Sequence, residues 1–260
     1  DEVSFVSVPL TIRTETQEFR DDASLDVETM VDTLRSTKGR SYSACPSVAD
    51  WERAFGEDDD VLAFTITSGL SGSFRAACAA KLNCEENSPS RRICIIDSLS
   101  TGPEIVLLIE KAVSELSAGA DFDAVCRSVQ DYQRRTHLIF ALESLHNLAQ
   151  NGRVGKLAAA AAGMLGIRAV GTTSDEGTLD LLGKCRGRKR AVDFLQEEME
   201  RLGYTGGCVR IGHCRNTDSA GELRTAILHR FPGANIRIYP LRGLCSYYAE
   251  CGGVLVGFEA

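Results

Sequence analysis

The chain has 260 residues, a formal net charge of −7, and 43% hydrophobic against 25% charged residues. This composition is typical of a globular protein, and the length allows one large domain or two modest ones. The acidic balance argues against a nucleic-acid-binding surface, and no apolar run reaches the roughly 18 residues that a membrane span needs.

The first 40 residues predict one strand and one helix. We expect a strand over residues 4–13, with Pro9 at an edge or irregular position. A polar turn follows at residues 19–22. Ser24 is then positioned to cap an amphipathic helix over residues 25–36.

A second helix and a buried strand come next. Ser47 is positioned to cap a helix that runs to about residue 55. Residues 61–67 are apolar and β-branched, which predicts a buried parallel strand. The Ser/Gly loop at residues 68–73 leads into an Ala-rich helix that starts near Arg75.

The alternation of strand and helix then continues. We expect a strand over residues 92–97, a Ser-rich loop at 97–102, and helices over 103–118 and 121–135. This order predicts an N-terminal three-layer α/β/α domain with a parallel sheet, spanning residues 1–135. Because such sheets bind ligands beyond the carboxyl ends of their strands, we expect both Ser-rich loops at one binding edge.

From residue 136 onward strands also come in pairs. This change predicts a second, C-terminal two-layer α/β domain with a mixed sheet, spanning residues 136–260. The Ala-rich run at 157–170 interrupts it, and a basic segment lies at 184–190. The expected strands are 137–145, ending in a short helix, two strands around a turn at 175–177, then 209–213, 235–240 and 253–258; the expected helices are 191–202 and 220–230.

The loop at residues 68–73 is the main candidate site. The first N–H groups of a helix have no internal partner, so a small-residue loop at a helix N-terminus suits a carboxylate or a phosphate. A P-loop motif is absent, and a nucleophile elbow would need Gly where Ser73 stands. Carboxylate capture by Ser71 and a helix cap without a ligand both stay open.

The ten cysteines are scattered, and no C-x-x-C pair is present. Zinc and thioredoxin-like sites commonly use such a pair, so we expect no metal site. Reduced, buried thiols in a cytoplasmic protein are the simpler interpretation.

Five motifs, in order along the chain, resemble those of the DegV family of bacterial fatty-acid-binding proteins. They are Ser43–Ser47 (SACPS), Ser68–Phe74 (SGLSGSF), Asp97–Gly102 (DSLSTG), Ser144–Val154 and Lys184–Ala191 (KCRGRKRA). The resemblance implies a two-domain fold that buries the acyl chain of a long-chain fatty acid. It places the carboxylate at Ser43, Ser71 and Gly72.

The resemblance also implies a partner. Some family members present the acid to a dihydroxyacetone-kinase-like fatty acid kinase, and the kinase-facing arginines carry over to Arg153 and Arg186. Glu250 stands where we align the family histidine, and Gly253 replaces a proline. Because a carboxylate beside a bound carboxylate is unfavourable, we expect Glu250 to pair with one of those arginines. The resemblance leaves room for transient membrane contact.

Two functions of different kinds follow. The first is a non-enzymatic fatty-acid carrier without a cofactor, in which about 14 buried CH₂ groups contribute at most about 11 kcal/mol. The second is a serine hydrolase of acyl esters that uses Ser71 with His213 as the base. The resemblance further leads us to expect about 20–30 residues ahead of Asp1, the usual length of a β-α unit.

Overall fold

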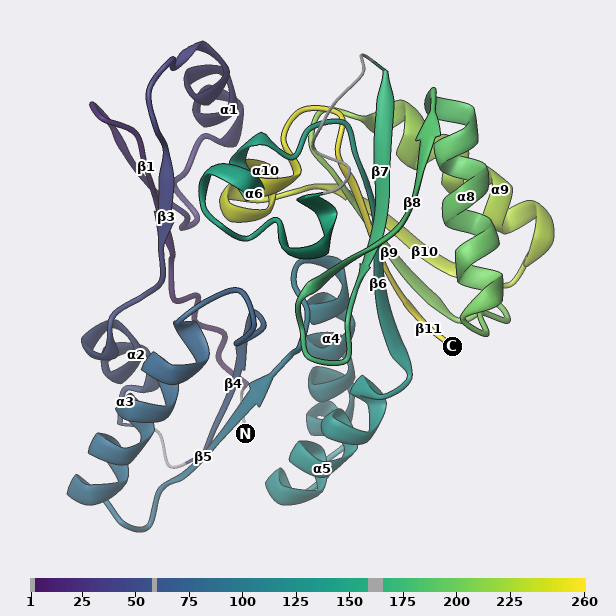
Figure 1. Ribbon diagram of the computed structural model, residues 1–260. Coiled ribbons are helices and arrows are strands. Elements are labelled where there is room, and N and C mark those ends of the chain that lie inside the picture. The colour runs from purple at the N-terminus through teal and green to yellow at the C-terminus, as the bar shows by residue number, and fades with distance from the viewer. Residues whose placement is uncertain (1–2, 58–59, 159–165) are drawn as a thin grey trace.

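The computed structural model describes residues 3–57, 60–158 and 166–260 (Figure 1). Within these ranges the strands form three sheets: a three-stranded antiparallel sheet, a two-stranded parallel sheet and a six-stranded mixed sheet. Within the run at residues 157–170, residues 159–165 lie outside the described residues.

The parallel sheet pairs β4 (Asp60–Thr65) with β5 (Arg92–Asp97). Successive side chains of a strand point to opposite faces. Ala63 and Ile93 therefore face α2 (Val48–Phe55) and α3 (Ser73–Asn87), whereas Phe64 and Ile96 face the opposite pair of helices, α4 (Pro103–Ser117) and α5 (Phe122–Gln133). This arrangement confirms a three-layer α/β/α unit (Figure 1).

Local sequence signals placed several of these elements correctly. Ser47 caps α2 through a capping box, in which its hydroxyl accepts the N–H of Asp50 and the Asp50 carboxylate accepts from Ser47. Strand β5 has the expected bounds, and α4 begins at Pro103 as expected. The helix expected near Arg75 begins slightly earlier, at Ser73.

The first 44 residues differ from the expectation. The strand expected over residues 4–13 is reduced to β1 (Thr11–Arg13), and the expected polar turn at 19–22 is wrong because its first half belongs to β2 (Glu18–Arg20). These two strands form an antiparallel sheet with β3 (Tyr42–Ala44). Cross-strand hydrogen bonding, which no local pattern encodes, decides the extended state here.

The cap expected at Ser24 is also wrong. Helix α1 (Val27–Ser36) begins after Asp26, whose carboxylate accepts the N–H of Thr29. The Ser24 hydroxyl instead donates to Asp22 at 2.6 Å. The Asp26 carboxylate lies two residues closer to the helix than Ser24, and it makes the stronger cap because its hydrogen bond is charge-assisted.

The six-stranded sheet has the order β10-β9-β11-β6-β7-β8, and only β10 and β9 are parallel. The mixed sheet is therefore confirmed, as is the hairpin around residues 175–177. Its strands are β6 (Thr136–Leu142), β7 (Ile167–Thr173), β8 (Leu179–Arg186), β9 (Cys208–His213), β10 (Asn235–Pro240) and β11 (Val254–Glu259).

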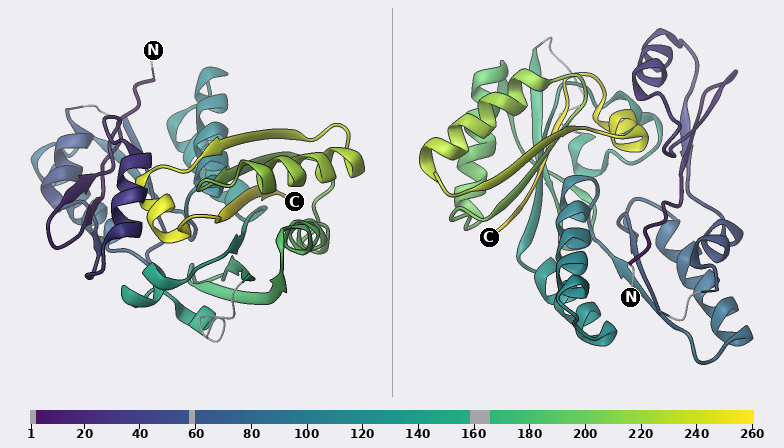
Figure 2. Two further views of the ribbon diagram at one scale, coloured as in Figure 1. Left: turned by 90° about the horizontal axis from the view of Figure 1, so that it is seen from above. Right: turned by 180° about the vertical axis from the view of Figure 1, so that it is seen from behind.

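Helices cover both faces of this sheet, so this part of the chain has three layers where two were expected. On one face, α8 (Arg188–Arg201) packs on β6, β7 and β8, and α9 (Thr217–Arg230) packs on β9 and β10. Ile139 and Ala141 of β6 belong to the core under these helices. The other face carries α4 and two short helices, α6 (His146–Gln150) and α10 (Gly243–Ala249). Figure 2 shows this division from above and from behind. Helix α10 was not expected from the sequence.

Helix α4 joins the two halves of the chain. Gly257 of β11 allows the close approach, because a Cβ there would lie 2.5 Å from the Glu104 nitrogen of α4. The same helix packs on β5 through Leu107 and Leu108. Since α4 belongs to both cores, the boundary between residues 135 and 136 stays a prediction.

Helix α10 holds the N-terminal sheet against the rest of the chain. The Asp21 carboxylate accepts the N–H groups of Gly243 at 2.9 Å and Leu244 at 2.7 Å, which neutralises the N-terminus of α10. Arg215 pairs with Glu28 and Asp32 of α1. These polar contacts fix a segment that shares little apolar surface with the parallel sheet.

Glu104 gives a testable consequence of this packing. Its side chain is 4% exposed, one oxygen accepts from Thr136 at 2.8 Å, and the other has no partner. Burial raises the pKa of this carboxyl. The unfolded chain then loses the proton first as pH rises above about 4.5, so stability falls with pH until the native group also ionises.

We therefore expect Glu104→Gln to raise the free energy of unfolding by about 1–3 kcal/mol at pH 8, with the gain vanishing below about pH 4.5. Urea unfolding of both proteins across this pH range measures the difference. Glu57→Gln, at an exposed position, is the matched control. A gain that stays constant with pH would contradict the buried-carboxyl account.

Candidate functional site

A cavity of about 310 Å³ lies against the face of the six-stranded sheet that carries α6 and α10. Alternate residues of β6 point into it, namely Leu138, Phe140 and Leu142, while the residues between them face α8 and α9. The remaining apolar wall comes from far apart in the chain, with Leu10, Ile66, Leu70, Leu148, Leu179, Leu244, Ala249 and Leu255. This wall suits an apolar ligand.

Four polar side chains of the cavity wall are linked by contacts with each other or with the loop at residues 68–73. We call Ser43, Ser71, Arg153 and Tyr248 the polar cluster. The hydroxyls of Ser43 and Tyr248 share a hydrogen bond of 2.7 Å. Arg153 stacks over the Tyr248 ring at 5.8 Å and donates from Nε to the Leu70 carbonyl at 2.9 Å, next to Ser71. Three hydroxyls and one guanidinium thus gather on one part of the wall.

The turn after β4 presents Ser71. The carbonyl of Thr67 accepts the N–H groups of both Leu70 and Ser71 at 3.2 Å. The Ser71 hydroxyl accepts from the Ser73 N–H at 3.2 Å, at the start of α3, and Gly72 is the N-cap of that helix. Gly72 is exposed and lines the cavity, so the cavity reaches the surface at the positive end of a helix.

The two Ser-rich loops meet as expected. The Ser68 N–H donates to the Asp97 carboxylate at 3.0 Å, and the Thr67 N–H donates to the Ser100 carbonyl at 2.8 Å. Carboxyl ends of adjacent parallel strands lie at one sheet edge, which is why residues 30 positions apart combine here. This edge borders the cavity.

Tyr248 was missed by the sequence analysis because α10 was missed. Burial raises the pKa of the Tyr248 phenol, so the group stays protonated at neutral pH and can donate. The available signal was a Tyr-Tyr pair in an apolar stretch bounded by Gly243 and Gly252.

Tyr247 anchors a second polar network behind the cluster. Its hydroxyl shares a hydrogen bond with Ser41 at 2.9 Å and accepts from Asn151 at 2.8 Å. Its carbonyl accepts from Asn147 at 2.8 Å. The Gln150 side-chain oxygen accepts from both the N–H and the hydroxyl of Ser41. Because this network ties β3 to α6 and α10, it sets the distance between Ser43 and Tyr248.

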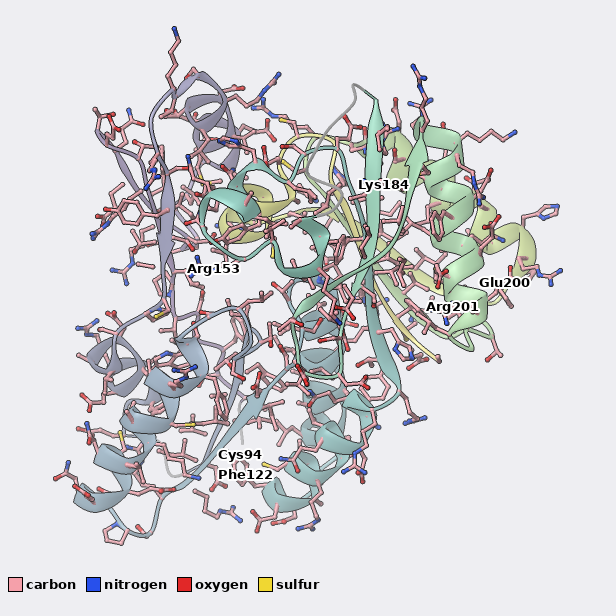
Figure 3. The ribbon with its side chains drawn as sticks, viewed as in Figure 1. Cys94, Phe122, Arg153, Lys184, Glu200 and Arg201 are labelled. Atoms are coloured by element: carbon pink, nitrogen blue, oxygen red, sulfur yellow. The ribbon has the colours of Figure 1, made fainter. Side chains whose placement is uncertain are left out.

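Arg153 and Arg186 lie in different places. Arg153 follows α6, lines the cavity and also donates to the Asn151 carbonyl at 3.1 Å (Figure 3). Arg186 ends β8, is exposed and does not line the cavity. The structure therefore brings Arg153, but not Arg186, to the expected carboxylate residues.

The expectation that Glu250 pairs with an arginine is wrong. Its carboxylate accepts the Asn147 N–H at 3.0 Å, and no ion pair joins it to Arg153 or Arg186, all of which are described residues. Glu250 follows α10 with a φ of 52°. It satisfies the first turn of α6, where an acceptor for unpaired N–H groups is favourable.

The structure does not assemble the hydrolase alternative. His213 is 7% exposed, its Nδ1 accepts the Asn216 N–H at 3.3 Å, and it does not line the cavity that Ser71 lines. Burial lowers the pKa of His213. Without a hydrogen bond to a base, the Ser71 hydroxyl is not an activated nucleophile. Among the described residues, no group of His, Cys, Asp and Glu side chains could hold a metal ion.

The fold and the cavity together define a class, that of α/β proteins that enclose an apolar cavity ending in hydroxyl groups. The chain belongs to the DegV family, since the model described as "Uncharacterised protein, DegV family" matches residues 2–259. A DegV domain-containing protein of Streptococcus pneumoniae is 44% identical over 256 residues, which cover 98% of this chain and 91% of that protein.

Solved structures give the same result. The Streptococcus pneumoniae Fatty Acid Kinase B3 protein loaded with linoleic acid is 44% identical, with a TM-score of 0.96 over 98% of this chain and 91% of that one. A DegV family protein from Eubacterium eligens loaded with heptadecanoic acid is 43% identical, with a TM-score of 0.94 over 97% and 92%. The expected fold class and family are therefore confirmed.

The Tyr247 network predicts a stability effect. Tyr247→Phe leaves Ser41 and Asn151 without their shared partner, so we expect the free energy of unfolding to fall by about 1–3 kcal/mol. Urea denaturation followed by circular dichroism measures the loss. Tyr42→Phe, on the exposed surface of β3, is the control and should change stability by less than about 0.5 kcal/mol. Equal effects of the two substitutions would show that the network contributes little.

Proposed function

We propose that this protein binds a long-chain fatty acid, with the tail in the cavity and the carboxylate at the polar cluster and Gly72. The observation that carries the proposal is the apolar cavity whose wall includes the polar cluster. In that cluster Tyr248 contacts both Ser43 and Arg153, and Arg153 donates to the Leu70 carbonyl next to Ser71. The two similar structures loaded with linoleic acid and heptadecanoic acid support it.

The chemistry of the cluster matches a carboxylate. The hydrogen-bonded pair of Ser43 and the protonated Tyr248 has one O–H left to donate, and the Ser71 hydroxyl can turn from Ser73 to donate a second. Hydrogen bonds to an ionised acceptor are stronger than those between neutral groups. The Arg153 guanidinium adds a positive charge that needs no proton uptake. The tail supplies most of the binding free energy because each buried CH₂ contributes about 0.8 kcal/mol.

The protein is then a carrier rather than an enzyme, and we place it in the cytoplasm. All ten cysteines are free thiols, which is usual in a reducing compartment. No helix among the described residues is long and apolar enough to cross a membrane. A carrier that takes up fatty acid also needs only transient contact with a membrane surface.

We further propose that the carrier presents its carboxylate to a dihydroxyacetone-kinase-like fatty acid kinase. The similarity to the Fatty Acid Kinase B3 protein supports this step. The exposed Arg186 is our candidate for the kinase contact, whereas Arg153 holds the head group. Glu250 acts on α6 and has no direct part in either contact.

The binding proposal is tested by native mass spectrometry of the purified protein, which should show a retained fatty acid. The protein is then delipidated and a C18 fatty acid is added back. Ser71→Ala and Tyr248→Phe should each lower the affinity for this acid by about tenfold, because a charged acceptor loses one donor. Ser88→Ala, at the exposed end of α3, should not. A ligand-free spectrum together with no binding of added acid would overturn the proposal.

The kinase proposal is tested separately. Arg186→Glu should slow acyl phosphate formation by a fatty acid kinase while the fatty-acid affinity stays unchanged, because Arg186 lies outside the cavity. Arg127→Glu, an equal charge reversal at an exposed position of α5, is the control. If both variants are phosphorylated at the wild-type rate, Arg186 does not contact the kinase.

A further inference from the structure

Thr67 lies where three distant chain segments meet. It is fully buried and follows β4. Its N–H donates to the Ser100 carbonyl of the loop after β5, and its hydroxyl donates to the Gly177 carbonyl of the β7–β8 turn at 2.9 Å. The same hydroxyl oxygen accepts the Gly69 N–H at 3.1 Å. Its hydroxyl is thus fully committed to the protein, although Thr67 borders the cavity.

The β7–β8 turn lies directly on the loop that carries Ser71. A Cβ on Gly177 would lie 2.0 Å from the Thr67 hydroxyl oxygen, and the residue has a φ of +72°. A Cβ on Gly69 would lie 2.9 Å from the carbonyls of Glu176 and Gly177. Backbone therefore meets backbone here, and no side chain separates the two segments.

Hydrogen bonds within the turn stabilise its conformation. The Ser174 N–H donates to the Thr178 carbonyl and the Gly177 N–H donates to the Ser174 carbonyl, each at 2.8 Å. The hydroxyls of Ser174 and Thr178 share a hydrogen bond of 2.9 Å. Leu179, the next residue, lines the cavity. One rigid segment thus borders the apolar wall and also contacts the loop that carries Ser71.

We propose that Thr67 is a positioning residue for the carboxylate site and that the β7–β8 turn, residues 174–178, is part of that site. Through the Thr67 hydroxyl the turn holds the loop at residues 67–72 so that Ser71 faces the head group. The inference rests on the proposed fatty-acid binding. It implies that losing the Thr67 hydroxyl weakens recognition of the carboxylate and leaves recognition of the tail intact.

The experiment compares a C18 fatty acid with its methyl ester, which has the same tail and no charge. Thr67→Val should lower the affinity for the acid by about tenfold and the affinity for the ester by less than about twofold. Thr67→Ser should keep the wild-type ratio of acid affinity to ester affinity. A purely structural defect would weaken both ligands together. Thr225→Val, which loses an equivalent hydroxyl on the exposed surface of α9, is the matched control.

A second variant approaches the contact from the other side. Gly177→Ala forces the turn away from Thr67, so it should produce the same selective loss, and the double variant should lose less than the sum of the two. If Thr67→Val does not fold, as judged by circular dichroism, Gly177→Ala and Thr67→Ser decide the question.

The outcomes separate the inference from the proposed function. An acid-to-ester ratio that stays at the wild-type value in Thr67→Val or Gly177→Ala overturns the positioning role alone. A Thr67→Ser variant as impaired as Thr67→Val overturns it as well. A wild-type protein that binds neither ligand overturns the proposed function, and the inference falls with it.

Discussion

A charged head group at the end of an apolar cavity can be held only where the protein supplies hydrogen-bond donors and compensating charge. In the binding that we propose, the donors come from Ser43, Ser71 and Tyr248, and the charge comes from Arg153, all of which line the cavity. Each of these four residues belongs to a different segment, so the cluster exists only if β3, the loop before α3, the turn after α6 and α10 reach one place. Much of the tertiary structure can be understood as the set of contacts that bring these segments together.

Besides the apolar core that α1, β6, α6 and α10 share, several of those contacts are polar. Asp21 caps α10, and the Tyr247 hydroxyl joins Ser41 to Asn151. The Thr67 hydroxyl donates to the Gly177 carbonyl of the β7–β8 turn. Hydrogen bonds have defined lengths and directions, whereas apolar packing tolerates small shifts. A network of this kind therefore suits the binding that we propose, in which the hydroxyls converge on one carboxylate and the apolar wall accommodates a flexible tail.

Whether an expectation was confirmed depended mainly on how far apart in the chain the interacting residues lie. The Ser47 capping box and the bounds of β5 were predicted correctly because neighbouring residues determine them. The turn expected at residues 19–22 and the cap expected at Ser24 failed, since cross-strand pairing and the competing carboxylate of Asp26 decide those positions. Helix α10 was missed because seven residues give too little periodicity to detect, and Tyr248 was missed with it.

By itself the sequence determined the α/β class, the mixed C-terminal sheet, the membership of the DegV family and the meeting of the two Ser-rich loops at one sheet edge. These follow from hydrophobic period and from motifs, which are local. Only the tertiary structure decided that Arg153 lines the cavity, that Glu250 serves α6, and that Tyr248 pairs with Ser43. Such pairings join residues roughly 100 to 200 positions apart, and the free energy that selects them arises only when the whole chain has packed.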